Sequence, residues 1–279
     1  MSDPAIDRYA VFGNPIAHSQ SPQIHTLFAE QTAQTLQYTA ELAEIGDFDH
    51  AVWQFFKNNG KGLNITVPFK EDAWALADRH SQRALRAGAV NTLSLQPNGS
   101  IYGDTTDGVG LATDLVQNHQ IKLKDKNILV IGAGGAVRGV LEALLNHTPA
   151  SLIVANRTKE KAQQLATDFS DLGNITGCGL NELKAQKFDV VINGTSASLQ
   201  GDLPPIPDTV FNADACSYDM MYSADPTPFM TWSLQHGATQ TFDGLGMLVE
   251  QAAESFYIWR GKRPDTQAVI QSIRTTLNA

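Results

Sequence analysis

Residues 126–192 constrain the fold of this chain more than any other stretch, because they alternate apolar strand patterns with helical patterns. The first strand, Lys126-Asn-Ile-Leu-Val-Ile131, carries the continuous apolar run that is typical of a parallel strand buried on both faces. Strands alternating with helices predict right-handed crossovers between parallel strands. We therefore expect a doubly wound α/β domain, with the order strand 126–131, helix to 145, strand 151–155, helix 160–169 and strand 188–192.

A run of small residues follows the first strand of this domain: Gly132, Ala133, Gly134, Gly135 and Ala136. A tight turn between a buried strand and a helix lets backbone N–H groups approach a pyrophosphate at the helix N-terminus. The match to G-x-G-x-x-G is partial, because Val137 stands where the third glycine is usual. We expect Gly135 and Ala136 to supply the close helix–strand packing instead. The placement favours a dinucleotide site over a plain tight turn.

The end of the second strand indicates which dinucleotide is bound. A domain that binds NAD usually carries Asp or Glu about 20 residues after the loop, to bind the ribose 2′-hydroxyl. Here the strand ends in Asn156, Arg157 and Thr158, with Lys159 and Lys161 close behind. A guanidinium binds a 2′-phosphate through charge-assisted hydrogen bonds, whereas a carboxylate would repel it. The alternative, a solvated basic helix start, fits poorly because cations oppose the macrodipole there. The sequence predicts NADP.

The length and net charge of the chain limit the number of domains and the classes of partner that we expect. The 279 residues suggest about two domains, and 29 acidic against 20 basic residues give a net charge of −9, which disfavours nucleic acid and anionic membranes as partners. The apolar runs are too short to span a bilayer, and we expect no secretory signal. Cys178 and Cys216 lie outside any metal-binding cluster and are interpreted as buried or half-buried thiols. We expect a cytoplasmic protein without a metal site.

The first third of the chain is also α/β but has no phosphate-binding loop of its own. Ser21 before Pro22 predicts a helix start, with the serine as N-cap and proline at the first helical position. The alternation of Leu63-Asn-Ile-Thr-Val67 predicts a half-buried strand. Residues 90–102, with the turn Pro97-Asn98-Gly99, predict a hairpin, and the tail predicts two helices, 246–260 and 265–277.

Short polar motifs occur along nearly the whole chain. They are Val11-Phe-Gly-Asn-Pro-Ile-Ala-His-Ser-Gln-Ser-Pro22, Asn64-Ile-Thr-Val-Pro-Phe-Lys70, Ala87-Gly-Ala-Val-Asn-Thr92, Gly103-Asp-Thr-Thr-Asp-Gly108, the glycine loop, Asn156-Arg-Thr158, Asn193-Gly-Thr-Ser196, Tyr218-Asp-Met-Met-Tyr222, Asp243-Gly-Leu-Gly-Met247 and Glu250-Gln-Ala252. Each motif is short, but the order in which they occur is highly specific. This ordered set resembles the shikimate dehydrogenase family.

The resemblance implies a two-domain α/β fold with a cleft between the domains. We expect an N-terminal substrate-binding and catalytic domain over residues 1–106, a Rossmann-type NADP-binding domain over 107–245, and C-terminal helices over 246–279 that pack back on the first domain. The implied activity is the reversible NADPH-dependent reduction of 3-dehydroshikimate to shikimate, in the biosynthesis of chorismate and the aromatic amino acids. A monomer and a homodimer are both open.

The resemblance assigns catalysis to Lys70 and Asp107. Hydride delivery to a ketone leaves a developing alkoxide that needs a proton donor in reach. Lys70 donates that proton or accepts it in the reverse direction, and Asp107 orients the lysine. An adjacent carboxylate favours the charged lysine, whereas desolvation disfavours it, and the sequence leaves that balance open. The alternative is a surface lysine at a helix start and an aspartate N-cap.

The substrate carboxylate and ring hydroxyls need convergent neutral donors. The resemblance assigns this binding to Ser19, Ser21, Thr66, Asn91, Tyr222 and Gln251. The alternatives are structural: an N-cap for Ser21, a solvent-facing or turn-bonding amide for Asn91, a core position for Tyr222 and an exposed amide for Gln251. His18 and His25 are interpreted as structural.

Around the nicotinamide, the resemblance points to Met220 and the region of Met247, with Gly244 giving backbone access. Lys161 departs from the family, which often places arginine there; a lysine reaches a 2′-phosphate only as a point charge. Two other functions stay open: a quinate/shikimate dehydrogenase using NAD or NADP, and a non-catalytic NADP-binding regulator. The missing acid and Arg157 disfavour NAD, and the presence of both Lys70 and Asp107 disfavours a regulator.

Overall fold

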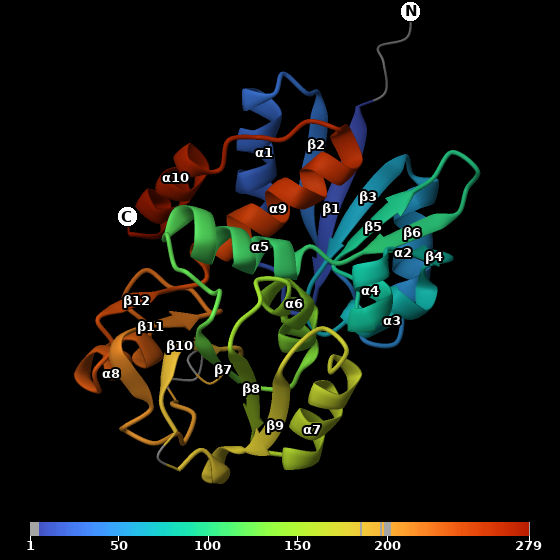
Figure 1. Ribbon diagram of the computed structural model, residues 1–279. Coiled ribbons are helices and arrows are strands. Elements are labelled where there is room, and N and C mark those ends of the chain that lie inside the picture. Colours follow the sequence, from blue (N-terminus) through green and yellow to red (C-terminus); the bar gives the residue numbers. More distant parts are fainter. Residues whose placement is uncertain (1–5, 185, 196, 198–201, 279) are drawn as a thin grey trace, which may run out of the picture. The chain divides into compact units, whose positions relative to one another are not determined.

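The computed structural model describes residues 6–184, 186–195, 197 and 202–278, and it divides into two compact units (Figure 1). Unit 1 comprises the chain up to Asp107 together with Val249–Thr276, and unit 2 comprises Gly108–Leu248, with the chain end from Leu277. Each unit contains its own six-stranded sheet covered by helices. Ser196, the last residue of one of the motifs, lies outside the described residues.

The sheet of unit 1 has the strand order β2-β1-β3-β5-β6-β4. Strand β1 pairs in parallel with β2 and β3, whereas β5 is antiparallel to both β3 and β6, which confirms the predicted hairpin. The elements are β1 Asp7–Gly13, α1 Ser21–Gln31, β2 Leu36–Leu42, α2 Phe48–Lys57, β3 Gly60–Ile65, α3 Lys70–Leu76, β4 Arg79–His80, α4 Gln82–Ala87, β5 Thr92–Leu95, β6 Ile101–Asp104, α9 Leu245–Arg260 and α10 Gln267–Leu277.

The two faces of this sheet bury different residues of each strand. Ala10 and Phe12 point to one face, where they pack in an apolar core with the α2 side chains Phe48 and Phe55. Tyr9 points to the other face and contacts Trp259 of α9, with ring centroids 4.8 Å apart. The period-two alternation of β1 therefore places α2 and α9 on opposite sides of the sheet.

The start of α1 differs from the prediction that Ser21 is its N-cap. Gln20 is the N-cap, and Ser21 is the first helical residue, followed by Pro22. The physical reason is that Ser19, rather than Ser21, satisfies a free backbone N–H at this end: its Oγ accepts from Ser21 N at 3.3 Å. The Ser21 side chain is therefore free of the capping role.

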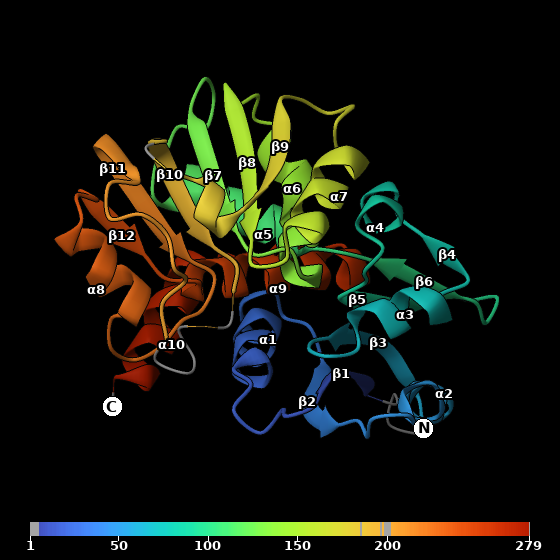
Figure 2. The same ribbon diagram turned by 90° about the horizontal axis from the view of Figure 1, so that it is seen from below.

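Unit 2 has the strand order β12-β11-β10-β7-β8-β9, and all its strand pairs are parallel (Figure 2). The first strand lies in the middle and the chain winds outward from it in both directions, which is the doubly wound order. The elements are α5 Asp107–Thr113, the π-helix η1 Asp114–Asn118, β7 Asn127–Ile131, α6 Gly135–Leu145, β8 Ser151–Asn156, α7 Lys159–Asp168, β9 Ile175–Gly179, the 3₁₀-helix η2 Leu180–Glu182, β10 Phe188–Asn193, β11 Phe211–Asp219, α8 Pro228–Gln235 and β12 Gln240–Phe242.

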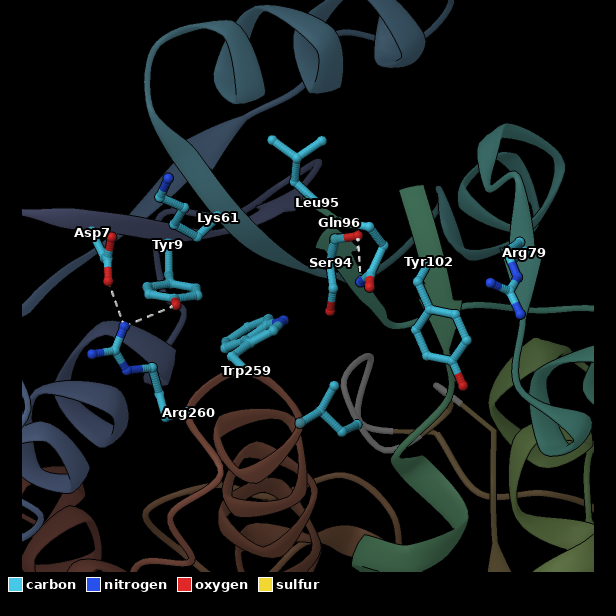
Figure 3. A pocket seen from close by; sticks show the side chains of 11 residues that line it. Asp7, Tyr9, Lys61, Arg79, Ser94, Leu95, Gln96, Tyr102, Trp259 and Arg260 are labelled. Carbon is cyan, nitrogen blue, oxygen red and sulfur yellow. Dashed lines mark hydrogen bonds and ion pairs between the residues drawn. The ribbon is translucent and has the colours of Figure 1, made fainter. Parts of the chain in front are cut away.

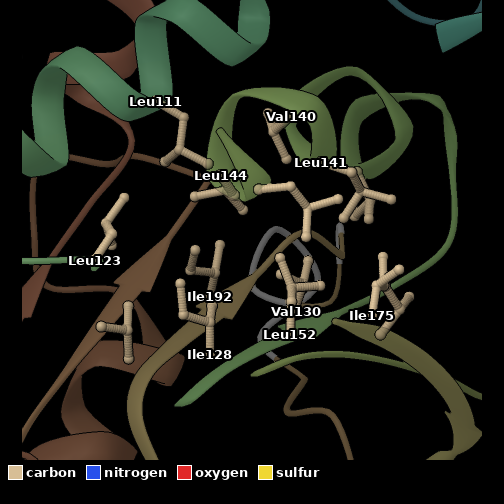
Figure 4. Close-up of a cluster of buried hydrophobic side chains, with 14 of the residues drawn as sticks. Leu111, Leu123, Ile128, Val130, Val140, Leu141, Leu144, Leu152, Ile175 and Ile192 are labelled. Atoms are coloured by element: carbon tan, nitrogen blue, oxygen red, sulfur yellow. The ribbon is translucent and has the colours of Figure 1, made fainter. Parts of the chain in front are cut away.

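A large apolar cluster holds α6 against this sheet. Figure 4 shows Val140, Leu141 and Leu144 of α6 facing side chains of β7 such as Ile128 and Val130. All five of these side chains are fully buried. Because burial of a large aliphatic side chain contributes about 1.5–3 kcal/mol, this cluster fixes the helix that starts at the glycine loop.

Two further sequence predictions concern thiols and membrane segments. Cys216 is buried and Cys178 is partly buried, and both are free thiols, as predicted. Burial raises the pKa of both thiols, that of Cys216 to about 11. Among the described residues, none of the helices combines the length and apolar character needed to cross a bilayer.

Candidate active site

Lys70 and Asp107 form an ion pair in unit 1, with Nζ and Oδ2 2.6 Å apart. Each is the first residue of a helix: Lys70 begins α3, shortly after β3 ends, and Asp107 begins α5, shortly after β6 ends. The lysine side chain is 18% exposed and the aspartate side chain 7%. The lysine therefore presents a partly accessible ammonium beside a nearly buried carboxylate.

Asn91 fixes the orientation of that carboxylate from the other side. Its Nδ2 donates to Asp107 Oδ1 at 2.9 Å, while its Oδ1 accepts from the Thr106 backbone N–H at 2.9 Å. The side chain is 3% exposed, so the solvent-facing alternative for this amide is wrong. Asn91 holds both Asp107 and the residue before it.

Gln251 of α9 joins the same group of side chains. Its Oε1 lies 3.2 Å from Asn91 Nδ2 and 3.3 Å from Thr106 Oγ1, and both of these atoms donate. The side chain is partly buried, in contrast to the exposed amide that was the alternative. The structure thus brings together four polar residues from four separate segments of the chain: Lys70, Asn91, Asp107 and Gln251.

Behind this group lies a buried polar network that the sequence analysis did not select. Asn64 Nδ2 donates to Ser255 Oγ at 2.9 Å, and Ser255 Oγ is 2.8 Å from Thr92 Oγ1. Tyr38 Oη donates to Asn64 Oδ1 at 2.7 Å, and burial raises the pKa of that phenol well above its ordinary value. Two sequence signals point to this network: Asn64 stands between apolar Leu63 and Ile65, and Ser255 follows Gln251 by one helical turn.

Ser19, Ser21 and Thr66 lie beyond the carboxyl ends of β1 and β3. Thr66 follows β3, and its backbone N–H donates to Phe12 O at 2.9 Å. Within the described part of the chain its hydroxyl has no hydrogen-bond partner. Ser21 is buried in unit 1. The structure thus leaves the Thr66 hydroxyl available to a ligand.

The glycine loop of unit 2 joins β7 to α6, and one of its residues has a backbone conformation that favours glycine. Gly132 has φ +110°, a backbone conformation that residues with a side chain rarely adopt. Gly134 is the N-cap of α6, and among the described residues, chain neighbours and the helix backbone aside, no atom lies within 4 Å of where a Cβ would stand on Gly134 or Gly135. The backbone at these two glycines therefore faces open space, as binding of a pyrophosphate requires.

The expectation that Gly135 supplies close helix packing is wrong, because no described residue beyond its neighbours lies within 4 Å of where a Cβ would stand on it. Ala136, in contrast, is partly buried and packs against the apolar core of unit 2. Val137 is fully buried, and its Cγ2 is the nearest atom to the place where a Cβ would stand on Gly194, just after β10. The glycine that permits close approach at this point lies on the neighbouring strand end rather than on the helix.

The basic residues that follow β8 differ in whether they form an ion pair. Lys159 Nζ is 2.6 Å from Glu182 Oε1, and this ion pair raises the pKa of the lysine. Arg157 and Lys161 are exposed and make no ion pair with any described residue. Asn156 Nδ2 donates to the Thr158 carbonyl at 2.9 Å, which shapes the turn before α7. Two uncompensated cations therefore flank this turn, and the residues present fit a 2′-phosphate.

Met220, Tyr222 and Gly244 lie beyond the carboxyl end of β11, also in unit 2. Gly244 N donates to Met221 O at 2.9 Å, and a Cβ at Gly244 would collide with the Met220 carbonyl. The glycine is thus required by a close backbone contact. Tyr222 is partly buried, and burial raises the pKa of its phenol. Among the described residues, no cluster of His, Cys, Asp or Glu has the arrangement of a metal site.

A parallel doubly wound sheet with an open glycine turn, free cations at the second strand and a Lys–Asp pair on another sheet defines a two-domain nucleotide-dependent dehydrogenase. Family models match most of the chain. The shikimate dehydrogenase substrate binding domain matches residues 11–93, shikimate/quinate 5-dehydrogenase matches 114–200, and the shikimate 5′-dehydrogenase C-terminal domain matches 244–274.

Relatives of known name agree with this assignment. A protein named shikimate dehydrogenase (NADP(+)) from Chromohalobacter salexigens is 57% identical, over 99% of this chain and 100% of its own length. One of the same name from Saccharophagus degradans is 54% identical, over 96% of this chain and 99% of its own length. A crystal structure of shikimate 5-dehydrogenase from Thermus thermophilus, in complex with NADP(H) and shikimate, is similar with a TM-score of 0.86 and 31% identity, covering 98% of this chain and 100% of that one.

The chain belongs to the NADP-dependent shikimate dehydrogenase family. The predicted family, the two-domain α/β fold class, the oxidoreductase class and the choice of NADP are confirmed. A non-catalytic regulator is not supported.

Proposed function

We propose that this chain catalyses the reversible reduction of 3-dehydroshikimate to shikimate by NADPH, with Lys70 and Asp107 as the proton-transfer pair. The observation that carries the proposal is the 2.6 Å contact between these two side chains, with the carboxylate fixed by Asn91. In the reductive direction the ketone, one hydride and one proton give the secondary alcohol. NADPH supplies the hydride when it is bound.

Lys70 supplies the proton in this proposal. Its ammonium donates to the oxygen that gains charge as the carbonyl is reduced, and it takes a proton from solvent afterwards. Asp107 accepts a hydrogen bond from the ammonium and so limits the directions in which Nζ points. In the oxidative direction neutral Lys70 accepts the hydroxyl proton as the hydride leaves.

We propose that neutral hydrogen-bonding groups bind the rest of the substrate: Ser19, Ser21, Thr66, Asn91, Tyr222 and Gln251. The free Thr66 hydroxyl and the Asn91–Gln251 contact at 3.2 Å support this assignment in unit 1. Ser21 is buried whereas Thr66 is partly exposed, so we expect Ser21 to contribute less to substrate binding than Thr66. A ligand hydroxyl that meets such groups satisfies donors and acceptors that are already oriented.

We propose that the loop Gly132, Ala133, Gly134, Gly135 and Ala136 binds the NADP pyrophosphate, and that Asn156, Arg157, Thr158 and Lys161 bind the adenosine side with its 2′-phosphate. The open space at Gly134 and the free charge of Arg157 and Lys161 support these roles. Met220 and Gly244 are proposed to border the nicotinamide.

We also propose that residues 1–106 form the substrate-binding domain and 107–245 the NADP-binding domain, and that residues 246–279 return to the first domain.

The metabolic setting is part of the same proposal. We propose that the enzyme works in the reductive direction in the biosynthesis of chorismate and the aromatic amino acids, in the cytoplasm, as a monomer or a homodimer. The free thiols of Cys178 and Cys216 support a reducing compartment.

The proposal is tested by following NADPH absorbance with purified enzyme and 3-dehydroshikimate. Loss of NADPH with formation of an equal amount of shikimate is expected. Absence of turnover by a folded enzyme that binds both ligands would disprove the proposed reaction.

A further inference from the structure

Unit 1 contains a pocket of about 580 Å³ whose lining includes none of the residues proposed for catalysis or substrate binding (Figure 3). Its floor follows a row of paired residues across five strands: Tyr9, Gly62, Ser94, Tyr102 and Arg79. Paired residues project from the same face of a sheet, so this row forms one surface. The last turn of α9, Ile258–Arg260, lies along it.

The pocket lies away from the strand ends that carry the proposed catalytic pair. Tyr9, Gly62 and Tyr102 stand near the starts of β1, β3 and β6, whereas Lys70 and Asp107 follow the ends of β3 and β6. A ligand in this pocket is therefore distinct from the substrate.

Gly62 and Trp259 shape a flat aromatic wall. A Cβ at Gly62 would collide with the Trp259 indole, so the glycine lets the ring lie directly on the sheet. Trp259 Nε1 donates to Leu93 O at 3.1 Å, and its ring centroid is 4.8 Å from that of Tyr9. In Figure 3 the rings of Tyr9, Trp259 and Tyr102 follow one another along the pocket. Such rigid rings favour a ligand that is itself flat.

Cations outnumber carboxylates around the pocket. Arg260 pairs with Asp7 at 2.5 Å, but Lys61 and Arg79 make no ion pair with any described residue. Lys61 stands at a β-bulge, since Arg8 pairs with Gly60 and Tyr9 with Gly62, and the bulge lets its side chain join the pocket lining. In a chain with net charge −9, this local excess of positive charge favours an anion.

Ser94 provides a buried polar group without a partner. The residue is 8% exposed, it lines the pocket, and its Oγ has no hydrogen-bond partner among the described residues. Buried hydroxyls are nearly always hydrogen-bonded, so this one is available to a bound ligand. In Figure 3 its side chain lies between those of Trp259 and Tyr102.

We infer that this pocket is a second ligand site, which takes a small carboxylate bearing a flat aromatic ring. Its volume falls within the range of about 300–1,000 Å³ that is usual for small-molecule sites. Arg79, paired with Tyr102 in the row, binds the carboxylate, while Lys61, three strands away at the other end of the pocket, adds to the positive potential. The aromatic side chains contact the ring, and Ser94 hydrogen-bonds a polar group of the ligand.

The test is calorimetric titration of the full chain with 4-hydroxybenzoate, in the presence of saturating shikimate and NADP⁺ so that the active site is filled. We expect one molecule to bind per chain. The double variant Lys61→Gln/Arg79→Gln should raise its Kd by roughly tenfold, as for loss of a charged hydrogen bond, and Ser94→Ala should raise it by a smaller factor. The KM for shikimate should stay unchanged in both variants.

The matched control is Lys57→Gln/Lys124→Gln, which removes the same charge at exposed positions outside the pocket and should bind 4-hydroxybenzoate like the wild type. The uncharged probe 4-hydroxybenzyl alcohol should bind much more weakly. Absence of 4-hydroxybenzoate binding with the active site filled would overturn the inference, as would equal losses in the two double variants. Turnover of 3-dehydroshikimate is measured separately, so failure of the second site is distinguishable from failure of the proposed reaction.

Discussion

At the scale of single residues, the two oxygens of Asp107 have separate partners. Oδ2 is 2.6 Å from the Lys70 ammonium, and Oδ1 accepts from Asn91 at 2.9 Å. Asn91 is in turn held by Thr106, so these two residues orient the Asp107 carboxylate independently of its contact with Lys70. A fixed carboxylate beside a partly exposed lysine is suited to repeated proton transfer, because only the lysine has to move.

Replacing the proposed proton donor should therefore slow the chemical step more than it weakens binding. Lys70→Ala is expected to lower kcat by roughly 10²–10⁴, the usual range for a general acid, with little change in KM. Initial rates from NADPH absorbance measure this. Lys57→Ala, at an exposed lysine in α2, is the control and should keep the wild-type rate. An unchanged kcat in Lys70→Ala would remove Lys70 from the mechanism.

The cations after β8 should differ in what they contribute to cofactor choice. Arg157→Ala is expected to weaken NADPH by about 1.5–3 kcal/mol, a typical cost of losing a charged hydrogen bond, and to leave NADH nearly unaffected. Lys159→Ala is the matched control, since Lys159 is already paired with Glu182, and its effect should be smaller. Fluorescence titration with each cofactor measures both. If Arg157→Ala weakens the two cofactors equally, Arg157 does not contact the 2′-phosphate.

The sequence allowed the selection of Lys70, Asp107, Asn91 and Gln251 through short motifs, and the structure brings these four together. It did not reveal the network behind them, because Asn64 and Ser255 are 191 positions apart and meet only after the sheet and α9 have packed. Local patterns carry no information about such contacts. The alternatives for Asn91 and Gln251 failed for the same reason, since burial depends on the folded arrangement.

At the scale of elements, the glycines in and around the loop are needed for different reasons: some for the backbone conformation or for packing, and one for ligand access. Gly132 is needed for its positive φ, and Gly194 for the close approach of Val137. Gly134 has an ordinary backbone, φ −89° and ψ 180°, and no atom from elsewhere in the described part of the chain lies close to where its side chain would start. Because Gly134 has neither a positive φ nor a close packing contact, we attribute the need for glycine there to the approach of NADP to the loop.

Gly134→Ala should therefore weaken NADPH binding without weakening the fold. We expect the free energy of unfolding without ligand to change by less than about 0.5 kcal/mol, as for a surface substitution. The KM for NADPH should rise by roughly 5–100-fold, equivalent to about 1–3 kcal/mol of steric strain. Urea unfolding and steady-state kinetics measure the two effects.

Gly108→Ala provides the opposite case for comparison. A Cβ there would stand 2.7 Å from the Gly139 carbonyl, where α5 packs against α6, and should destabilise the fold by about 1–3 kcal/mol. A Gly134→Ala enzyme with normal KM for NADPH would contradict the proposed role of the loop.

The doubly wound domain was predictable because its strands are continuous apolar runs and its loop is a local motif. Helix boundaries were less so: α1 begins one residue earlier than the serine–proline signal indicated, because Ser19 supplies the acceptor at that end. The packing predicted for Gly135 failed because the compensating glycine, Gly194, belongs to another strand end.

At the scale of the whole molecule, the acidic net charge describes the surface in general and does not exclude anionic ligands. Arg157, Lys161, Lys61 and Arg79 are free of ion pairs within the described residues and form local exceptions. The buried interior also contains a titratable group whose charge state affects the stability of the entire fold. That group is His25, which is 1% exposed and stacks on Tyr38 with centroids 4.0 Å apart.

Acid should destabilise the protein through His25. Burial lowers its pKa from 6.5 to about 3, so below pH 6.5 the unfolded chain binds a proton that the folded protein excludes. Its contribution is complete above pH 6.5 and is lost as the pH falls toward 3, by about 2 kcal/mol at pH 5. Urea unfolding between pH 7.5 and 5 measures this.

The comparison variant is His25→Phe, which retains a ring in an aromatic site but does not titrate, and which should show a smaller loss of stability on acidification. His50→Gln, at an exposed histidine, should behave like the wild type. The same pH dependence in His25→Phe and in the wild type would show that His25 is not the responsible group.

The pairing of shikimate with NADP in this enzyme is measured by kcat/KM for shikimate and quinate, each with NADP⁺ and with NAD⁺, in one absorbance assay. We expect the highest kcat/KM for shikimate with NADP⁺, and a lower value when quinate replaces shikimate or NAD⁺ replaces NADP⁺. A comparable kcat/KM for quinate with NAD⁺ would contradict this expectation.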